Sequence, residues 1–554
     1  MLTTSFKHIA ELVEILVQNN IYNVVISPGS RNAPLIIAFD SHPDIKTYVI
    51  TDERSAAFFA LGLIDELQTG VAIVCTSGSA PLNYSPAVAE AYYRQLPLLV
   101  LTADRPSHLI DQGDGQCIRQ YDVYRNFIKQ SFTLNALDSI EQSTLAIESL
   151  LCHPQGPVHI NLPLVEPLYQ QKEYTCTHNY ALKLQQNNKL SVKEKKELKS
   201  FWNESPKKLI IIGQMTPNKK LQQLFGTIAQ DSSIAVLVEN TSNIQFFNKF
   251  CHNIDRVLAL ITEDELETYK PDILISMGGA IISKKIKAFF RQNKPKHNWR
   301  VGNYLLDEDT YQSKTKSIKV PAEHFLEFIS QLETKNISNF GNKWKAKDFI
   351  SQQKHLNFIE SAPYSDLTVF DLILDTLPEN CNLQMANSSV VRYCQLFNPV
   401  QSITYYANRG VSGIDGSTST ALGMAVANPD KLIVLITGDL SFFYDSNALW
   451  NNYLPSNFRI IVINNNGGGI FKIIDGPQST MQQHIFVAPH NGKIEHLCKA
   501  FNVEYLYANS ISSLEGIMYN FYSTNSNKTK LLEINTSQVV NEQVLKNYFK
   551  KLIE

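Results

Sequence analysis

The sequence predicts an α/β protein made of three parallel-sheet domains with flanking helices. Short runs of β-branched apolar residues alternate with longer helical patterns along most of the chain, which is typical of βαβ units. With 554 residues, the chain exceeds the size at which one hydrophobic core keeps growing, so about three domains are expected. Two polar stretches, 184–208 and 335–356, are interpreted as linkers, and the domains are placed at 1–183, 184–345 and 346–554.

The individual elements follow from the spacing of apolar residues. Near the N-terminus, Ile9, Leu12, Val13, Leu16 and Val17 recur at helical spacing and predict a first amphipathic helix. The β-branched runs predict strands at 22–27, 71–76, 98–102 and 158–162 in the first domain, 209–212, 235–239 and 273–277 in the second, and 432–436 and 460–463 in the third.

Composition excludes several classes of protein. Apolar residues make up 44% and charged residues 18%, and no segment approaches the ~20 uninterrupted apolar residues of a membrane span. Fifty basic and fifty-two acidic residues nearly cancel, so no global field attracts nucleic acid or anionic lipid. The eight cysteines form no CxxC pair or zinc-type cluster, and the start of the chain does not resemble a secretory signal. A cytoplasmic protein with reduced thiols is expected.

Polar side chains follow two predicted strands of the third domain. The run 432–436 leads into Gly438, Asp439, Leu440 and Ser441, and the run 460–463 leads into the stretch 464–469, NNNGGG. The carboxyl ends of parallel strands share one edge of a sheet, where ligands bind. Mg²⁺ prefers oxygen ligands, commonly a few protein groups plus phosphate oxygens. We therefore expect a metal diphosphate here, with amide donors supplied by a helix starting near Ser441.

The proposed metal ligands are the Asp439 carboxylate, the Asn466 amide oxygen and the Gly468 carbonyl. Either motif alone also fits an ordinary turn after a strand. Together they resemble the fingerprint of thiamine-diphosphate enzymes, GDG followed by NN, with a separation here of 466 − 439 = 27 residues and Leu440 replacing the second glycine. Such enzymes need a glutamate at the aminopyrimidine ring. Glu53, in the stretch TDERSAA, is the candidate, although it could instead simply cap the following helix.

Motifs along the whole chain carry a narrower resemblance, which is weakest in the middle domain. The stretches SPGSRNAPL, TDERSAAFFALGL, TSGSAPLNYSPAVAEA, LTADRP, GPVHINLP, NRGVSGIDGSTSTALG, TGDLSFFYD and NNNGGGIF resemble the 2-succinyl-5-enolpyruvyl-6-hydroxy-3-cyclohexene-1-carboxylate synthase family of menaquinone biosynthesis. That family tolerates leucine in the GDL motif. The resemblance implies the thiamine-diphosphate-enzyme architecture, with a pyrimidine-binding domain, a middle domain and a diphosphate-binding domain in that order.

The resemblance also implies an activity and an assembly. The family decarboxylates 2-oxoglutarate and adds the succinyl-carbanion equivalent to isochorismate, using thiamine diphosphate and Mg²⁺ or Mn²⁺. It forms a homodimer with shared active sites, or a homotetramer, in which Glu53 of one chain faces the metal diphosphate of the other. Around the cofactor, Ile414 would hold its bent form, while Gly438, Leu440, Ser441, Ile470 and Phe471 would line its site.

Each substrate carries two carboxylates, so a nearly neutral protein needs local cations, and Arg suits bidentate carboxylate binding. By similarity to the family, substrate contacts are expected from Ser30, Arg31, Arg105, Gln116, Lys284, Arg392 and Arg409. Of these, Arg31, Arg392 and Arg409 join Glu53 as catalytic residues. The alternative for each arginine is a solvated surface position, and Lys284 could belong to the charged face of a helix.

Other functions remain as alternatives. An acetolactate synthase or another 2-oxo acid decarboxylase would share the cofactor motifs but would seldom need several arginines. A catalytically inactive scaffold of the same fold would not need Glu53, Asp439 and Asn466 together. A nicotinamide dehydrogenase is disfavoured because no GxGxxG opens a helix after the first strand.

Overall fold

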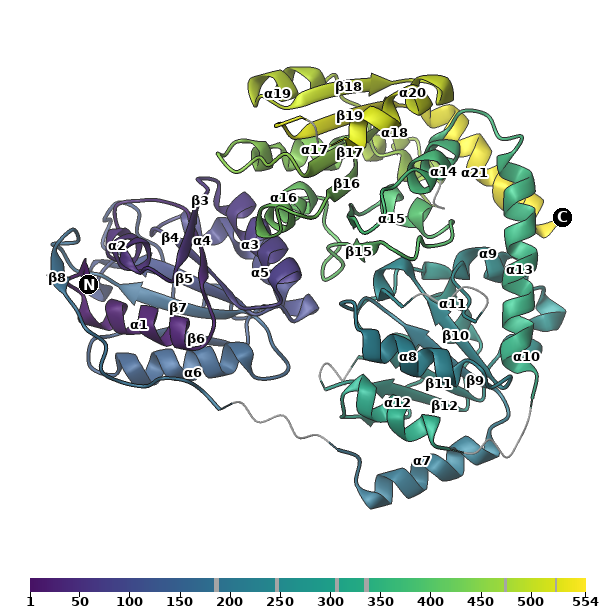
Figure 1. The fold of residues 1–554 in the computed structure, drawn as a ribbon, viewed down its shortest axis with the longest axis horizontal. Helices are drawn as coiled ribbons and strands as arrows, with labels where there is room; N and C mark the ends of the chain where they lie inside the picture. The colour runs from purple at the N-terminus through teal and green to yellow at the C-terminus, as the bar shows by residue number, and fades with distance from the viewer. Residues whose placement is uncertain (184–188, 245–248, 304–307, 333–337, 473–475, 524–525) are drawn as a thin grey trace.

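In a computed structural model of the chain, three parallel β-sheets with flanking helices follow one another along the sequence (Figure 1). The structure describes residues 1–554 except 184–188, 245–248, 304–307, 333–337, 473–475 and 524–525. The predicted fold class is confirmed, and every predicted strand is present with ends that agree within about two residues.

The first sheet has six parallel strands in the order β3-β2-β4-β5-β7-β6. These are β3 (Lys46–Val49), β2 (Asn23–Ile26), β4 (Val71–Cys75), β5 (Leu98–Asp104), β7 (Val158–Pro163) and β6 (Gln130–Thr133). One face packs on α1 (Lys7–Gln18), α2 (Ala33–Ser41) and α6 (Ser139–Leu151), and the other on α3 (Glu53–Leu67) and α5 (Ser85–Arg94), with the short α4 (Ala80–Asn83) before it. A two-stranded antiparallel ribbon pairs β1 (Leu2–Thr4) with β8 (Gln171–Glu173).

The third sheet repeats this plan with the order β15-β14-β16-β17-β19-β18. Its strands are β15 (Thr404–Tyr406), β14 (Asn382–Met385), β16 (Ile433–Gly438), β17 (Phe458–Asn464), β19 (Lys530–Asn535) and β18 (Glu504–Ala508). One face packs on α14 (Asp366–Asp375), α15 (Ser389–Cys394), α20 (Ile511–Tyr522) and α21 (Gln538–Ile553), and the other on α16 (Ser417–Ala427) and α19 (Ile494–Ala500). The short helices α17 (Asp439–Tyr444) and α18 (Gln483–Val487) lie in loops at this sheet.

The first and third sheets share one hydrophobic core. Helices α3 and α16 cross between them, and one continuous cluster runs from Ile73 of the first sheet through Phe59 and Leu422 to Leu435 of the third. A Cβ on Gly62 would be 2.8 Å from the Met424 amide nitrogen, so only glycine allows α3 and α16 this close approach. The two candidate cofactor motifs are therefore carried by sheets that are packed against each other.

The middle sheet has five parallel strands in the order β10-β9-β11-β12-β13. They are β10 (Ile234–Val238), β9 (Lys208–Ile212), β11 (Ile273–Met277), β12 (His297–Val301) and β13 (Lys316–Ile318). Helices α7 (Val192–Glu204), α8 (Lys219–Ile228) and α12 (Ala322–Ser330) cover one face, and α9 (Ile254–Ala259), α10 (Leu266–Tyr269), α11 (Lys284–Gln292) and α13 (Phe340–Ile359) cover the other.

Both stretches interpreted as linkers contain helices, and that interpretation was wrong for most of their length. In α7, Ser191 and Glu194 form a capping box, and only Leu198 and Trp202 are buried. In α13, Phe340 and Trp344 enter the core of the middle sheet, so the division placed at residue 345 falls inside this helix. In the sequence, a helix that buries only one narrow stripe of side chains looks like a polar linker, because most of its residues face water.

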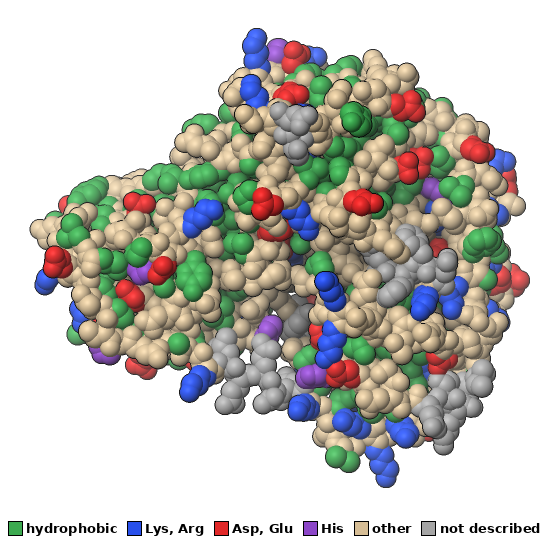
Figure 2. Space-filling view, viewed as in Figure 1, with side chains coloured by type: hydrophobic (Ala, Val, Ile, Leu, Met, Phe, Trp, Pro, Cys, Tyr) green, Lys and Arg blue, Asp and Glu red, His purple; other side chains and the backbone are tan. Residues whose placement is uncertain are grey.

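In the space-filling view, the first sheet and its helices form a lobe that joins the rest of the molecule along one side (Figure 2). On this face, basic and acidic side chains are interspersed, in keeping with the net charge of −2. Among the described residues, no helix has the length and apolar character needed to cross a membrane.

Candidate active site

The two motifs of the third domain meet at the carboxyl edge of its sheet. Strand β16 pairs in parallel with β17, and Gly438 lies opposite Ile463, so Asp439 emerges beside the asparagine-rich loop. The buried Asp439 accepts hydrogen bonds from the Gly467 amide through Oδ2 and from the Leu440 amide through Oδ1, both at 2.7 Å. Asn466 has a φ of +67°, so the loop turns sharply against this carboxylate.

A histidine that the motifs do not contain completes the surroundings of Asp439. His490 Nε2 lies 3.1 Å from Asp439 Oδ2, and the Gly492 amide donates to His490 Nδ1 at 3.2 Å. Because Nδ1 accepts, the neutral tautomer carries its proton on Nε2 and donates it to Asp439. Burial raises the pKa of Asp439, while the Gly467, Leu440 and His490 donors oppose that rise and favour the carboxylate.

This edge has the chemistry that a metal diphosphate requires. The Asp439–Gly467 hydrogen bond places Asn466 and Gly468 next to the carboxylate, which gives a carboxylate, an amide and backbone carbonyls as oxygen donors. Among the described residues, no group of three or more His, Cys, Asp or Glu side chains could hold a metal. A cation bound at this edge would take the oxygens of Asp439, Asn466 and Gly468 together with the diphosphate oxygens of the ligand.

The other predicted cofactor contacts surround this point. The Ser441 hydroxyl donates to the Ile414 carbonyl at 2.9 Å, so the loop before α16 is tied to α17. Helix α17 has only six residues, and the Leu440 amide is already bonded to Asp439, so the helix itself offers few donors. Ile470 and Phe471 are half-buried in the loop after β17, and the Phe471 ring lies 5.8 Å from that of Phe486.

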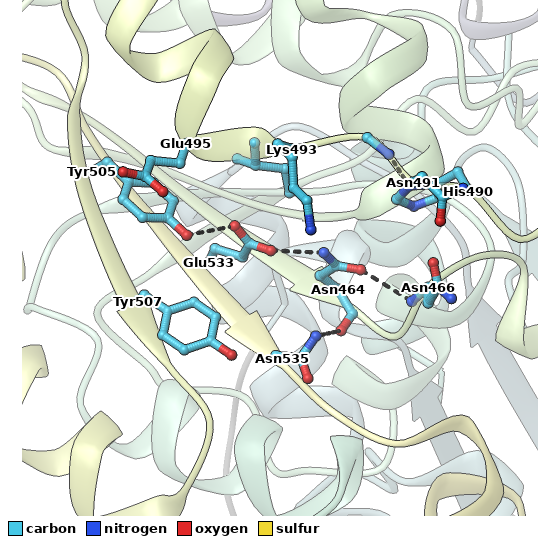
Figure 3. Close-up of a pocket in the computed structure, with 12 residues that line it drawn as sticks. Asn464, Asn466, His490, Asn491, Lys493, Glu495, Tyr505, Tyr507, Glu533 and Asn535 are labelled. Atoms are coloured by element: carbon cyan, nitrogen blue, oxygen red, sulfur yellow. Dashed lines mark hydrogen bonds between the residues drawn. The ribbon is translucent and has the colours of Figure 1, made fainter.

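A cavity of about 460 Å³ opens beside the same sheet edge. Figure 3 shows Asn466 and His490 at one side of it, and a chain of hydrogen bonds from Asn466 through Asn464 and Glu533 to Tyr505 along its wall. The asparagine cluster thus also forms part of the wall of this cavity.

Glu53 is the first residue of α3 and is half-buried. Its Oε2 accepts a hydrogen bond from Asn83 at 3.3 Å, and burial raises its pKa above the ordinary value. Its neighbours connect α3 to the third domain: Asn447 donates to Asp52 at 2.6 Å, and Arg54 donates to the Tyr444 carbonyl at 2.8 Å. Tyr444 ends the helix that begins at Asp439, so the Glu53 and Asp439 motifs lie on elements in direct contact.

The predicted substrate residues fall into groups. At the edge of the first sheet, the buried Arg31 donates to the Leu164 carbonyl at 3.0 Å and to Glu166 at 3.3 Å, and Ser30 beside it is exposed. In the loop after β5, Arg105 donates to the Gly115 carbonyl at 3.0 Å, next to Gln116, whose φ is +52°. The structure thus brings Arg105 and Gln116 together in one loop.

Arg392 and Arg409 lie together where the third sheet meets the middle sheet. Arg409 donates to Asn387 at 2.7 Å; burial lowers its pKa, and the charge of Arg392 adds to this effect while Glu239 opposes it. The loop after Arg409 is held from the first domain, because the buried Glu90 accepts from the Gly410 and Val411 amides at 2.9 and 2.7 Å. Lys284 is exposed at the start of α11.

The chain matches three domain families of known enzymes and several named proteins. Residues 8–123 match the N-terminal TPP binding domain of thiamine pyrophosphate enzymes, 169–385 match the middle domain, and 386–534 match the C-terminal TPP binding domain. Proteins named 2-succinyl-5-enolpyruvyl-6-hydroxy-3-cyclohexene-1-carboxylate synthase are similar over nearly their full length. Those of Flavobacterium psychrophilum and Christiangramia forsetii are 42% identical, covering 98% and 97% of both chains, and that of Bacteroides fragilis is 34% identical over 99%.

The chain belongs to this synthase family. It is therefore a thiamine-diphosphate-dependent enzyme, and the three-domain α/β architecture predicted from the motifs is confirmed. The cofactor of the family is thiamine diphosphate with a divalent metal ion, and the oxygen donors around Asp439 fit that pair.

Residues that support the site were missing from the sequence prediction. His490 orients Asp439, Glu90 holds the Arg409 loop, and Asp366 accepts from Asn465 at 3.3 Å and from Thr536 at 2.6 Å beneath the asparagine loop. In the sequence, each of these residues is visible only as a charged or titratable residue in an otherwise apolar or loop segment. The sequence does not show which residue it bonds to, because that partner is distant in the chain.

Proposed function

We propose that this chain decarboxylates 2-oxoglutarate and joins the remaining four-carbon unit to isochorismate by conjugate addition. The products would be 2-succinyl-5-enolpyruvyl-6-hydroxy-3-cyclohexene-1-carboxylate and CO₂, a step of menaquinone biosynthesis. The proposal rests on one observation above all. In a member of this synthase family, the hydrogen bond between Asp439 and Gly467 joins the two halves of the cofactor motif at one sheet edge.

When bound, thiamine diphosphate supplies the electron sink that accepts the electron pair left by the departing carboxylate. In this proposal, the residues of this chain supply the contacts for both ends of that group, one end in each of two paired chains. Asp439, Asn466 and Gly468 would bind its diphosphate through Mg²⁺ or Mn²⁺. Glu53 would hydrogen-bond the ring nitrogen at the other end, and its raised pKa suits a carboxyl group that shares a proton with a ring nitrogen.

The arginines would bind and orient the substrates. Arg392 and Arg409 lie near the junction of the middle and third sheets, where the charge of Arg392 lowers the pKa of Arg409 after burial. Arg31 and Arg105, with Ser30 and Gln116, lie at loops that follow strands of the first sheet. Partly buried guanidinium groups bind carboxylates more strongly than solvated ones, because less of their interaction energy is lost to water. Lys284 remains a further candidate for the same role.

We also propose that the working enzyme is a cytoplasmic homodimer, or a homotetramer built from two such dimers, in which Glu53 of one chain serves the metal diphosphate of the other. Large apolar side chains support an interface here, because Tyr444, Trp450 and Val411 are exposed on segments that carry the motifs. A reducing compartment agrees with eight cysteines that are all free.

The test is product analysis. The enzyme with thiamine diphosphate and Mg²⁺ would be incubated with 2-oxoglutarate or pyruvate, each with and without isochorismate, and CO₂ and carbon–carbon products would be measured. We expect CO₂ and the succinylated product from 2-oxoglutarate with isochorismate. Acetolactate from pyruvate would indicate an acetolactate-synthase-like enzyme, and no CO₂ from either acid would indicate an inactive scaffold.

A further inference from the structure

A small group of charged side chains lies where the middle sheet meets the third sheet. Glu239 follows β10, Lys287 is on α11, Arg392 is on α15 and Arg409 follows β15. A small cavity of about 10 Å³ at this junction is lined by Glu239, Ser283 and Arg392 together. The two arginines were expected at the substrate site, whereas Glu239 and Lys287 were not.

Glu239 fixes the start of α11 at this junction. Its two carboxylate oxygens accept hydrogen bonds from the Ile282 and Ser283 amides, both at 2.7 Å, and the side chain is buried. Ser283 in turn caps α11 by accepting from the Ile286 amide at 3.1 Å. The first turn of α11 is therefore held against the end of β10, next to Arg392.

The direction of each lysine on α11 follows from helix geometry. The buried face of α11 is formed by Ile286, Phe289 and Phe290. At about 100° per residue, Lys287 lies roughly 100° around the helix from Ile286, whereas Lys284 lies roughly 160° away. The exposure agrees with this, since Lys284 is exposed and Lys287 is half-buried. The ammonium group of Lys285 is engaged elsewhere, 3.6 Å from the ring centroid of Phe549. Lys287 is thus the half-buried lysine of this turn, on the flank of α11 between its buried and its exposed face.

Electrostatics places Lys287 in the same group. Burial lowers the pKa of Lys287, and the charges of Arg409, Arg291 and Arg392 lower it further. The charge of Glu239 opposes this shift. Burial also raises the pKa of Glu239 to about 7. Asp255 and Glu90 add two negative charges nearby, and Lys285 adds one positive charge. The junction therefore keeps an excess of positive charge, which an anionic ligand would neutralise.

We propose that Lys287 is a specificity-determining residue which, with Arg392 and Arg409, binds a carboxylate of the dicarboxylic 2-oxo acid, while Glu239 holds α11 in position. This inference rests on the proposed function and deepens it, because it names the group that separates a dicarboxylate from a monocarboxylate of similar shape. The half-buried lysine can reach the junction with its ammonium group while its methylene chain packs along α11.

The test compares Lys287→Met with wild-type holoenzyme, using 2-oxoglutarate and the monocarboxylate 2-oxobutyrate in an assay of CO₂ release. Loss of one charged hydrogen bond should raise KM for 2-oxoglutarate about 10- to 100-fold and leave the values for 2-oxobutyrate within about twofold. Lys287→Arg should restore most of the loss. Lys294→Met, at an exposed lysine just after α11, is the matched control and should behave like wild type.

A second measurement keeps the inference separate from the proposed function. Calorimetric titration with succinate, a dicarboxylate that cannot react, should show weaker binding to Lys287→Met than to wild type or Lys294→Met. Unchanged succinate affinity in Lys287→Met would overturn the inference even if 2-oxoglutarate is turned over normally. A larger loss in Lys284→Met than in Lys287→Met would also overturn it. Failure of wild type to release CO₂ from 2-oxoglutarate would instead refute the proposed function.

Discussion

The contact between α3 and α16 can be tested by adding one methyl group at Gly62. A Cβ there would lie 2.8 Å from the Met424 amide nitrogen and closer still to the Thr420 carbonyl oxygen, whereas ordinary contact begins at 3.4 Å. The two helices would have to part by at least 0.6 Å, which is 3.4 − 2.8. Because both partners are backbone atoms of a packed helix, no side-chain rotation can relieve the clash.

Overpacking of this kind costs about 1–3 kcal/mol. In a domain of roughly 150–250 residues, each kcal/mol shifts the melting temperature by about 2–4 °C, so Gly62→Ala should melt about 2–12 °C below wild type. The measurement is thermal unfolding followed by circular dichroism and calorimetry. Cofactor affinity should fall as well, since α3 carries Glu53 and packs beside the elements that carry Asp439.

Gly516→Ala is the matched control. It places the same methyl group on a glycine inside α20 with no atom within 4 Å, so only the helix preference of alanine acts, and stability should rise by about 0.5–1 kcal/mol. A melting temperature of Gly62→Ala at or above that of wild type would contradict a steric clash between α3 and α16. Gly423→Ala, which meets the Phe59 carbonyl across the same contact, should be destabilised like Gly62→Ala.

Three further predictions concern the cofactor site and its support. Glu53→Gln should lower kcat about 10²–10⁴-fold with the fold intact, and near-normal CO₂ release would remove Glu53 from the mechanism. Asp439→Ala should abolish Mg²⁺-dependent binding of thiamine diphosphate in calorimetry, and unchanged affinity would contradict the metal site. Burial raises the pKa of Asp445, which accepts from Ser419, from 3.8 to about 7. The unfolded chain therefore releases this proton first, and wild type loses stability as pH rises from about 4 to 7. Asp445→Asn has no such proton to release, so its free energy of unfolding relative to wild type should rise by up to about 4 kcal/mol between pH 4 and 7. A stability difference that does not change with pH would contradict the raised pKa of Asp445.

The sequence predicted the parts of the site that depend on adjacent strands. Asp439 and the loop at 464–469 follow β16 and β17, which are neighbours in the sheet, and parallel strands end at a common edge. Two local motifs were therefore sufficient to bring a carboxylate and an asparagine cluster together. Glu53 was also proposed from a local motif, and the structure places it as the first residue of α3.

The sequence-based prediction was wrong for two helices whose residues mostly face water. The polar stretches now seen as α7 and α13 carry too few apolar residues to show a clear period, and their buried Trp202 and Trp344 gain meaning only against the middle sheet. The capping box at Ser191 and Glu194 was the available local signal for α7.

By itself, then, the sequence determined the positions of the nine predicted strands along the chain, the sheet edge at which Asp439 and the asparagine-rich loop meet, and the family. Tertiary structure decided which side chains act on that edge. The donation of His490 to Asp439, the bonds from the Gly410 and Val411 amides to Glu90, and the bond from the Ile282 amide to Glu239 each join residues from different elements. A local pattern reports periodicity and turns along the chain, whereas these contacts depend on how distant segments pack, which no short stretch of sequence encodes.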